Sequence, residues 1–163
     1  MPLQRVRYQF TAKLPVSRAQ AYRWATDYRA TDLKLGGLEA SRKVERLTTD
    51  LVLLTDSFDA DPFDRTAGAR SVKMKLVHLY PDRWEWTSTH LSGPATHSQF
   101  LYKLTPRGAS GSTLHFTGSQ VEKVDRPPTP SSLRRRAQEL RREDSKLWAR
   151  FSAALAKGSD RVA

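Results

Sequence analysis

One carboxylate interrupts the apolar face of the helix predicted over residues 132–157. At about 100° per residue, Asp144 lies on that face between Leu140 and Trp148. A carboxylate in this position needs a partner or a wet cavity, because burying an unpaired charge is costly. Two interpretations remain open at this stage: a salt bridge at the edge of the apolar face, and a group that lines a cavity.

Two predicted strands carry further candidates for acid and base chemistry. The period-2 pattern of the strand at 83–91 places Ser88 and His90 on one face. Asp56 shares a face with the apolar residues of the strand at 51–58. Each of these groups is either a general acid or base, or a hydrogen-bonded part of the core.

The spacing of potential metal ligands does not indicate a metal site. The four histidines lie on four predicted strands without the paired spacing of a metal-binding helix, and the chain has no cysteine. The segment ADPFDR at 60–65 lacks the Gly and the closing Glu of an EF-hand, so we interpret it as a polar loop. The sequence also lacks GxSxG, GxGxxG and GxxxxGK[ST] motifs. We expect neither a metal nor a cofactor.

Bulk composition limits the class of protein. A chain of 163 residues most simply forms one domain, which we expect to span residues 1–163. No apolar run approaches the roughly 20 residues that cross a bilayer, and the opening residues lack the pattern of a secretion signal. We therefore predict a cytoplasmic location.

The net charge of +11 raises the question of a polyanionic partner. The Arg and Lys residues are spread along the whole chain, and the helix at 132–157 carries seven of them on its back: Arg134, Arg135, Arg136, Arg141, Arg142, Lys146 and Arg150. Its glutamates lie within one turn of basic residues, which is typical of a solvated face. We therefore favour a solvated back and do not expect nucleic-acid binding. Peripheral contact with anionic membranes is retained as an alternative.

Hydrophobic periodicity predicts a long antiparallel meander between helices. A strand at 5–14 is followed by a helix at 18–28, which Ser17 and Gln20 cap, and by a short helical piece at 31–35. Further strands are predicted near residues 42–48, 51–58, 69–80, 83–91, 97–105 and 112–123. The helix at 132–157 follows, with Ser131 or Ser132 as its cap and Gly158 at its end.

This order of elements resembles the START-like, or SRPBCC, superfamily, particularly its polyketide cyclase/dehydrase-like members. The residues that carry the resemblance are YQFTAKLPVSRAQAYRWATDY at 8–28, YPDRWEWTSTHLSGPATHSQFLYKLTPRGASGSTLHFTGS at 80–119, and the helix at 132–157. The resemblance implies an α+β helix-grip fold. In that fold a curved seven-stranded antiparallel sheet wraps around a long C-terminal helix, with two short helices after the first strand.

The resemblance also implies a cavity between the sheet and the long helix for an apolar molecule such as a lipid, sterol or polyketide. The cavity walls would then be Val72, Met74, Trp86, Phe100, Tyr102, Phe116, Leu147, Trp148 and Phe151. The segment 33–38, with two glycines, would act as a gate. The nearest candidates for catalytic groups in the cavity are Ser88, His90, Tyr102 and Asp144.

Three functions from different classes follow from these observations. The first is a noncatalytic protein that binds or carries a small hydrophobic ligand. The second is an aromatase/cyclase-type enzyme that acts in the same cavity. The third is a basic surface module for anionic lipid or nucleic acid.

Overall fold

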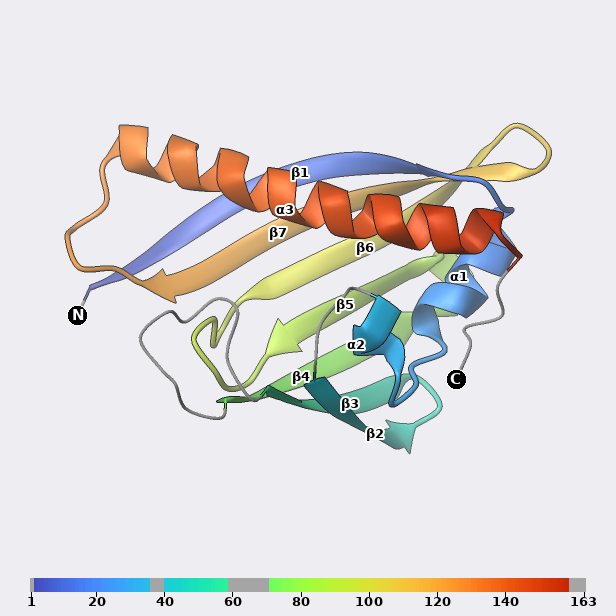
Figure 1. Cartoon of the computed structure of the whole chain (residues 1–163), viewed down its shortest axis with the longest axis horizontal. Coiled ribbons are helices and arrows are strands. Elements are labelled where there is room, and N and C mark those ends of the chain that lie inside the picture. Colours follow the sequence, from blue (N-terminus) through green and yellow to red (C-terminus); the bar gives the residue numbers. More distant parts are fainter. Residues whose placement is uncertain (1, 36–39, 59–70, 159–163) are drawn as a thin grey trace.

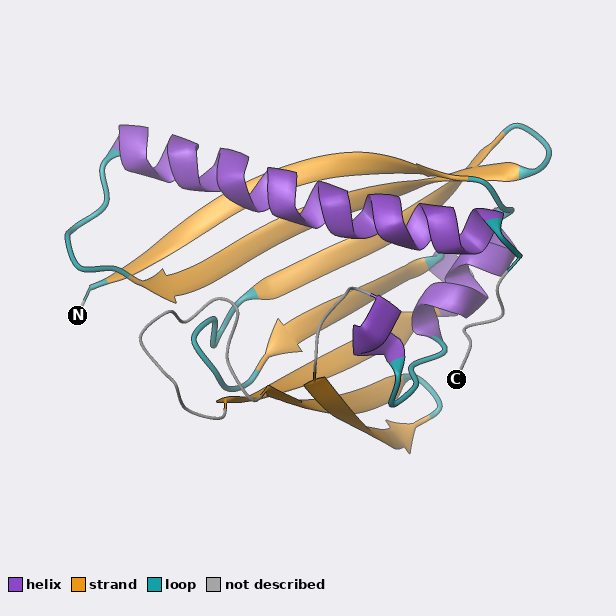
Figure 2. Cartoon of the chain, in the orientation of Figure 1, coloured by secondary structure: helices purple, strands orange, loops and turns teal. Residues whose placement is uncertain are grey.

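The computed structural model describes residues 2–35, 40–58 and 71–158, which form one antiparallel sheet with helices on one face (Figures 1 and 2). The elements in chain order are β1 (Leu3–Leu14), α1 (Arg18–Thr26), α2 (Asp32–Leu35), β2 (Ala40–Thr48), β3 (Leu51–Phe58), β4 (Ser71–Tyr80), the 3₁₀ helix η1 (Pro81–Arg83), β5 (Glu85–His90), β6 (Gln99–Arg107), β7 (Gly111–Lys123) and α3 (Pro130–Ala156). The element order agrees with the prediction.

The seven strands form one curved sheet in the order β1-β7-β6-β5-β4-β3-β2, and every neighbouring pair is antiparallel (Figure 1). Strands β2 to β7 follow one another as a meander, while β1 pairs with β7 along its whole length. The predicted helix-grip α+β fold is confirmed.

All three α-helices lie on one side of the sheet, which we call the inner face. Helix α3 crosses β1, β7 and β6 on this side, and α1 and α2 lie beside the C-terminal half of α3 (Figure 1). Helix α2 contacts both β2 and α3. The inner face is therefore covered by α3 along the β1 side, by α1 against β6 and β7, and by α2 on the β2 side.

The alternation of β1 produces its half-buried position. Val6, Tyr8, Phe10 and Leu14 are buried, and the residues between them face outward. Successive strand residues point to opposite faces, so a single alternating segment can cover the core and still meet solvent. The register places Phe10 directly opposite Phe116 of β7, and their rings stack with centroids 4.7 Å apart.

The N-cap of helix α3 lies two or three residues before the predicted one. Its N-cap is Thr129, not Ser131 or Ser132, and Pro130 occupies the first turn. The Thr129 hydroxyl accepts a hydrogen bond from the Ser132 backbone N–H at 3.1 Å, and the Ser132 hydroxyl accepts one from the Thr129 N–H at 2.9 Å. This reciprocal pair satisfies two backbone donors, and proline at the first helical position needs no donor. Gly158, with a φ of 63°, follows the helix as predicted.

Aromatic rings from the sheet and from α3 meet in the core. Trp86 of β5 and Tyr102 of β6 are directly paired in the register and stack with centroids 4.8 Å apart. Trp148 of α3 lies 6.0 Å from the Tyr102 ring, and Phe116 of β7 lies 5.2 Å from it. Tyr102 is thus the aromatic residue at which the central strands and α3 come together.

Gly118 of β7 leaves space for the ring of Tyr8. These two residues are directly paired across β1 and β7. A Cβ atom on Gly118 would lie 2.7 Å from Cε1 of Tyr8 and 2.9 Å from Cε1 of Phe116. Both contacts are shorter than carbon atoms tolerate, so glycine at this position allows the Tyr8 ring to lie against the strand.

We expect Gly118→Ala to destabilise the protein by about 1–3 kcal/mol, because the added methyl overpacks two aromatic rings. Urea denaturation followed by tryptophan fluorescence measures this change. The matched control is Thr117→Ala, an exposed neighbour on the same strand, which should alter stability by less than about 0.5 kcal/mol. Equal stability of Gly118→Ala and the wild type would show that the Tyr8 ring does not depend on this space.

Candidate functional site

Asp144 of α3 points towards the sheet and is joined to β1. Its Oδ2 accepts a hydrogen bond of 2.5 Å from the Tyr8 hydroxyl. The prediction that Asp144 lies on the apolar face of its helix is correct. Of its two interpretations, the salt bridge is not found among the described residues: the partner of Asp144 is a neutral phenol.

The Asp144 carboxyl is poorly solvated and has no cation as a hydrogen-bond partner. Burial raises the pKa of Asp144 above its ordinary value, and the hydrogen bond from Tyr8 offsets this rise only in part. Burial, followed by the negative charge of Asp144, raises the pKa of Tyr8 and of Tyr102. Asp144 therefore retains a proton to higher pH than a solvent-exposed aspartate, with two phenols near it.

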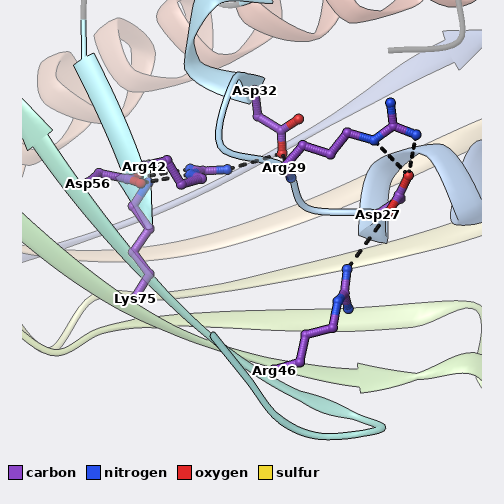
Figure 3. A network of polar contacts seen from close by, with 7 residues as sticks. All are labelled: Asp27, Arg29, Asp32, Arg42, Arg46, Asp56 and Lys75. Carbon is purple, nitrogen blue, oxygen red and sulfur yellow. Dashed lines mark hydrogen bonds and ion pairs between the residues drawn. The ribbon is translucent and has the colours of Figure 1, made fainter. Parts of the chain in front are cut away.

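A second polar centre lies on the inner face near the β2 edge of the sheet (Figure 3). Asp56 of β3 is fully buried, with 0% exposure, and it pairs directly with Arg42 of β2 in the register. Arg42 donates two hydrogen bonds to it, from Nε to Oδ1 at 2.7 Å and from Nη2 to Oδ2 at 2.9 Å. The Nη1 of Arg42 also lies 3.4 Å from Oδ2 of Asp32 on α2. This bidentate pairing gives a buried carboxylate a partner of matching geometry.

Lys75 of β4 supplies a further cation to this centre, with its Nζ 3.3 Å from Oδ2 of Asp56 (Figure 3). Burial opposes ionisation of Asp56, but the hydrogen bonds from Arg42 and the charge of Lys75 outweigh it, so its pKa lies below the ordinary value. Burial lowers the pKa of Lys75, although the charge of Asp56 acts in the opposite direction. The pKa values of Asp56 and Asp144 thus shift in opposite directions, because Asp56 has cationic partners and Asp144 has a neutral phenol.

His90 ends β5 beside this centre. Its Cα pairs directly with that of Lys75, and its ring meets the edge of Phe100 with centroids 5.2 Å apart. Burial, joined by the charges of Lys75 and Lys73, lowers the pKa of His90 to about 3. Within the described part of the chain, its Nδ1 is buried without a hydrogen-bond partner. His90 is therefore a neutral imidazole at neutral pH, with one unused ring nitrogen.

The two polar centres influence each other across the interior. The positive charge of Lys75 lowers the pKa of Asp144, and that of Arg42 lowers the pKa of Tyr102, although burial dominates both values. Both centres therefore face one shared interior, with the aromatic residues of β5, β6 and α3 between them.

Most of the predicted wall residues lie on the inner side of the structure. Buried residues of this set that belong to the core are Trp86, Phe100, Phe116 and Trp148. Tyr102 and Phe151 are partly buried and pack against that core, and Leu147 is half-buried. Their proposed role in ligand binding stays a prediction.

The prediction for β4 is wrong about its face. Val72 and Met74 pair with Ser57 and Thr55 of β3, which face away from the helices, and Val72 is 47% exposed. The inward residues of β4 are instead Lys73, Lys75, Val77 and Leu79. Val72 and Met74 therefore do not line the space under α3. The alternation offered two faces, and the face with more apolar side chains turned out to be the outer one.

Other predicted residues fall in several places. Ser88 is buried on the inner face of β5, directly opposite Phe100. Of the predicted gate at 33–38, residues 36–38 lie outside the described residues, as does the polar loop at 60–65. The sequence analysis did not identify Tyr8, Arg42 or Lys75 as site residues. The inward Asp56 was the available signal, since a buried carboxylate requires a cation on a neighbouring strand.

The basic back of α3 is largely exposed, as predicted, with one exception. Arg136 turns towards the sheet and binds Glu122 of β7 through Nε at 2.8 Å and Nη2 at 3.1 Å. It is therefore a link between α3 and β7 and not part of a free basic surface. The alternative that the remaining basic residues contact an anionic membrane stays a prediction.

The described ranges contain neither a metal-binding cluster nor a membrane-spanning helix. Among these residues, no group of three or more His, Asp or Glu side chains is placed to hold a metal ion. No helix in the same part of the chain has the length and apolar character needed to cross a membrane.

Comparison with known proteins places this architecture among solved structures. No family model and no curated protein matches the sequence. The Zhui aromatase/cyclase from Streptomyces sp. R1128 is similar, with a TM-score of 0.71, 12% identity, and coverage of 96% of this chain and 98% of that one. A START superfamily protein from Mycobacterium smegmatis has a TM-score of 0.66 and 14% identity, with 91% and 98% covered. Norcoclaurine synthase from Thalictrum flavum, in complex with dopamine and hydroxybenzaldehyde, has a TM-score of 0.68 and 10% identity, with 98% and 91% covered. These likenesses confirm the START-like fold that the sequence analysis expected.

The raised pKa of Asp144 predicts a particular dependence of stability on pH. In the folded state this carboxyl binds its proton more tightly than in the unfolded chain, whose aspartates titrate near pH 4. Its contribution to stability is therefore fully present below about pH 4 and is lost as pH rises through the folded pKa.

Asp144→Asn removes this titration but retains an acceptor for the Tyr8 hydroxyl. We expect the variant to gain stability relative to the wild type, so that the difference in free energy of unfolding (variant minus wild type) increases between about pH 4 and pH 7. Denaturant titrations at both pH values measure this difference. A difference that stays constant, or that changes in the opposite direction, would contradict the burial of a carboxyl without a cationic partner at this position.

Proposed function

We propose that this protein binds a small, largely apolar ligand between the inner face of the sheet and α3, and carries it in the cytoplasm. Three sets of observations support this proposal: the exposure of inward side chains, the nature of the surrounding walls, and the fold.

The observation that carries the proposal is an unusual combination of exposure and desolvation. The side chain of Lys75 keeps 23% of its surface exposed, although burial is the largest influence on its pKa. Tyr102, His90 and Asp144 are likewise only half-buried, and burial is also the largest influence on their pKa values. A solidly packed core would leave such groups no surface. We infer that they border an internal space surrounded by protein.

The walls around these groups suit an apolar guest. Trp86, Phe100, Phe116 and Trp148 present aromatic rings to the interior. Burial of apolar surface contributes about 25 cal/mol per Å², so contact with several rings is enough to drive uptake of a small molecule. A few polar groups, such as Asp144 and Ser88, would then orient the guest.

The fold supports the same class of ligand. Norcoclaurine synthase, which has this architecture, was solved with dopamine and hydroxybenzaldehyde, and another neighbour is an aromatase/cyclase. For this chain we propose a lipid, sterol or polyketide-like ligand, since the walls favour shape and apolar contact over a dense set of hydrogen bonds.

Binding of the uncharged fluorescent probe N-phenyl-1-naphthylamine tests the proposal. We expect saturable binding to the wild-type protein. Ser88→Leu should weaken it by about tenfold, because the larger side chain extends into the proposed space from the inner face of β5. The matched control is Thr87→Leu, whose side chain projects from the opposite face of the same strand, and it should leave the affinity unchanged. Absence of probe binding by the folded wild-type protein would overturn the proposal.

A second candidate function is an aromatase/cyclase-type enzyme, and the Tyr8–Asp144 hydrogen bond favours it. A carboxyl that keeps its proton to higher pH can act as a general acid, and a phenol at 2.5 Å can relay a proton to or from it. Ser88, His90 and Tyr102 are the further polar groups on the inner face. In this alternative, the wall residues would fold a reactive chain while Asp144 and Tyr8 move protons.

Cyclisation of a linear poly-β-carbonyl substrate distinguishes the enzyme from the carrier. If the protein is an enzyme, Asp144→Asn and Tyr8→Phe should each reduce turnover by about 100-fold or more. Binding of the naphthylamine probe should persist in both variants, because neither substitution removes an aromatic wall. His90→Ala, tested in parallel, reports whether the second polar centre takes part. Turnover unchanged by all three substitutions would remove these residues as catalysts.

A further inference from the structure

The polar centre around Asp56 contains the ammonium group of Lys75, whose N–H donors are not all occupied by its contact with Asp56. Lys75 lies on the inner face of β4, where its Cα is paired with Leu54 of β3 on one side and with His90 of β5 on the other. Its side chain therefore extends from the floor of the space proposed above and belongs to neither sheet edge.

Lys75 is the third partner of a carboxylate that already has two strong hydrogen bonds. Arg42 holds both oxygens of Asp56, at 2.7 and 2.9 Å, while the Nζ of Lys75 lies 3.3 Å from one of them. An ammonium group carries three N–H donors. Within the described part of the chain, Asp56 is the only ion-pair partner of Lys75. Donors therefore remain on Lys75 that a guest can use.

His90 supplies a second unused polar atom next to Lys75. Its Nδ1 is buried and lacks a hydrogen-bond partner among the described residues. A neutral imidazole has one N–H, and either ring nitrogen can carry it. The partly exposed imidazole can thus donate its N–H to an oxygen atom of a guest, once the ring turns that nitrogen towards the space beside Lys75. A buried polar atom without a partner is costly, so a guest that satisfies it gains affinity.

The electrostatic environment at His90 favours negative charge. Lys75 and Lys73 both lower the pKa of His90, and the opposing effect of Asp56 is smaller than theirs. The potential at the imidazole is therefore positive. An anionic oxygen placed between His90 and Lys75 would be stabilised by this field, which little water screens.

Among common anionic groups, a carboxylate fits this arrangement best. It has two oxygens, one for the Lys75 ammonium and one for the His90 N–H, and it carries a single charge. A phosphate dianion would cost more to bury beside Asp56, because the desolvation penalty rises steeply with charge. The apolar rings of Phe100 and Trp86 lie on the adjoining strands, where the apolar body of the ligand would continue.

We propose that the ligand is an amphipathic carboxylic acid whose carboxylate binds Lys75 Nζ and the imidazole N–H of His90, with its apolar body against the aromatic walls. This inference rests on the proposed binding function and narrows its substrate class.

Competition between an acid and its ester tests the inference. The affinities of dodecanoic acid and methyl dodecanoate, both below their aggregation concentrations, are measured by displacement of N-phenyl-1-naphthylamine from the protein. The two compounds share one apolar chain and differ in charge. We expect the wild-type protein to bind the acid about tenfold more tightly than the ester, as a hydrogen-bonded charge contributes that much.

Variants assign this preference to the proposed residues. Lys75→Met should bring the acid-to-ester affinity ratio close to one while ester binding is kept, and Lys75→Arg should preserve the preference. His90→Phe should reduce the ratio by a smaller factor, because it removes one neutral donor. The control is Lys103→Met, whose side chain is 52% exposed and pairs with Glu85, and it should leave the ratio unchanged. Circular dichroism and melting curves check that each variant is folded.

The outcomes separate this inference from the proposed function. Equal affinity of acid and ester in the wild type, or a ratio that Lys75→Met does not alter, would overturn the carboxylate site while apolar binding stands. The wild-type comparison needs no variant, so misfolding of Lys75→Met would not protect the inference. Failure of the naphthylamine probe and of both dodecanoyl compounds to bind would overturn the proposed function together with the inference.

Discussion

The structure depends on how three inward-facing carboxylates are paired. Asp56 binds Arg42 and Lys75 and so joins β2, β3 and β4. Glu122 binds Arg136 and Gln4 and so joins β7 to α3 and β1. Asp144 binds Tyr8 and joins the middle of α3 to β1. Breaking a buried ionic pair costs several kcal/mol, so the pairs of Asp56 hold β2, β3 and β4 together. The contacts of Glu122 and Asp144 help to specify where α3 lies on the sheet.

The partner of each carboxylate decides its chemistry. Guanidinium and ammonium partners hold the pKa of Asp56 below its ordinary value, and the hydrogen bonds from Arg136 do the same for Glu122, although burial opposes both effects. Tyr8 carries no charge, so burial prevails at Asp144 and its pKa rises. The same residue type thus serves as a fixed anion at one end of the inner face and as a proton-holding group at the other. Between them lie the aromatic rings, an arrangement suited to a ligand with an apolar body and distinct polar ends.

Local signals in the sequence were sufficient for much of the fold. Alternation in residues 5–14 predicted β1, and the apolar face of residues 132–157 predicted α3, because period and face are properties of a single segment. The position of Asp144 on that face was predicted for the same reason. Its partner was not, since Tyr8 is 136 residues away along the chain and only the packing of α3 across β1 brings the two together.

The sequence by itself determined the order of elements, the N-cap of α1, the apolar face of α3 and the presence of a carboxylate within it. Only the tertiary structure decided which face of β4 turns inward. The sequence alone favours the face of Val72 and Met74 as the core face, because the other face carries two lysines. The register with β3 and β5 nevertheless turns Lys73 and Lys75 inward and Val72 and Met74 outward. A strand's own residues fix the alternation of its side chains. Which of the two alternating sets faces inward is decided by the register with the neighbouring strands to which it is hydrogen-bonded. The polar centre of Arg42, Asp56, Lys75 and His90 exists for that reason alone.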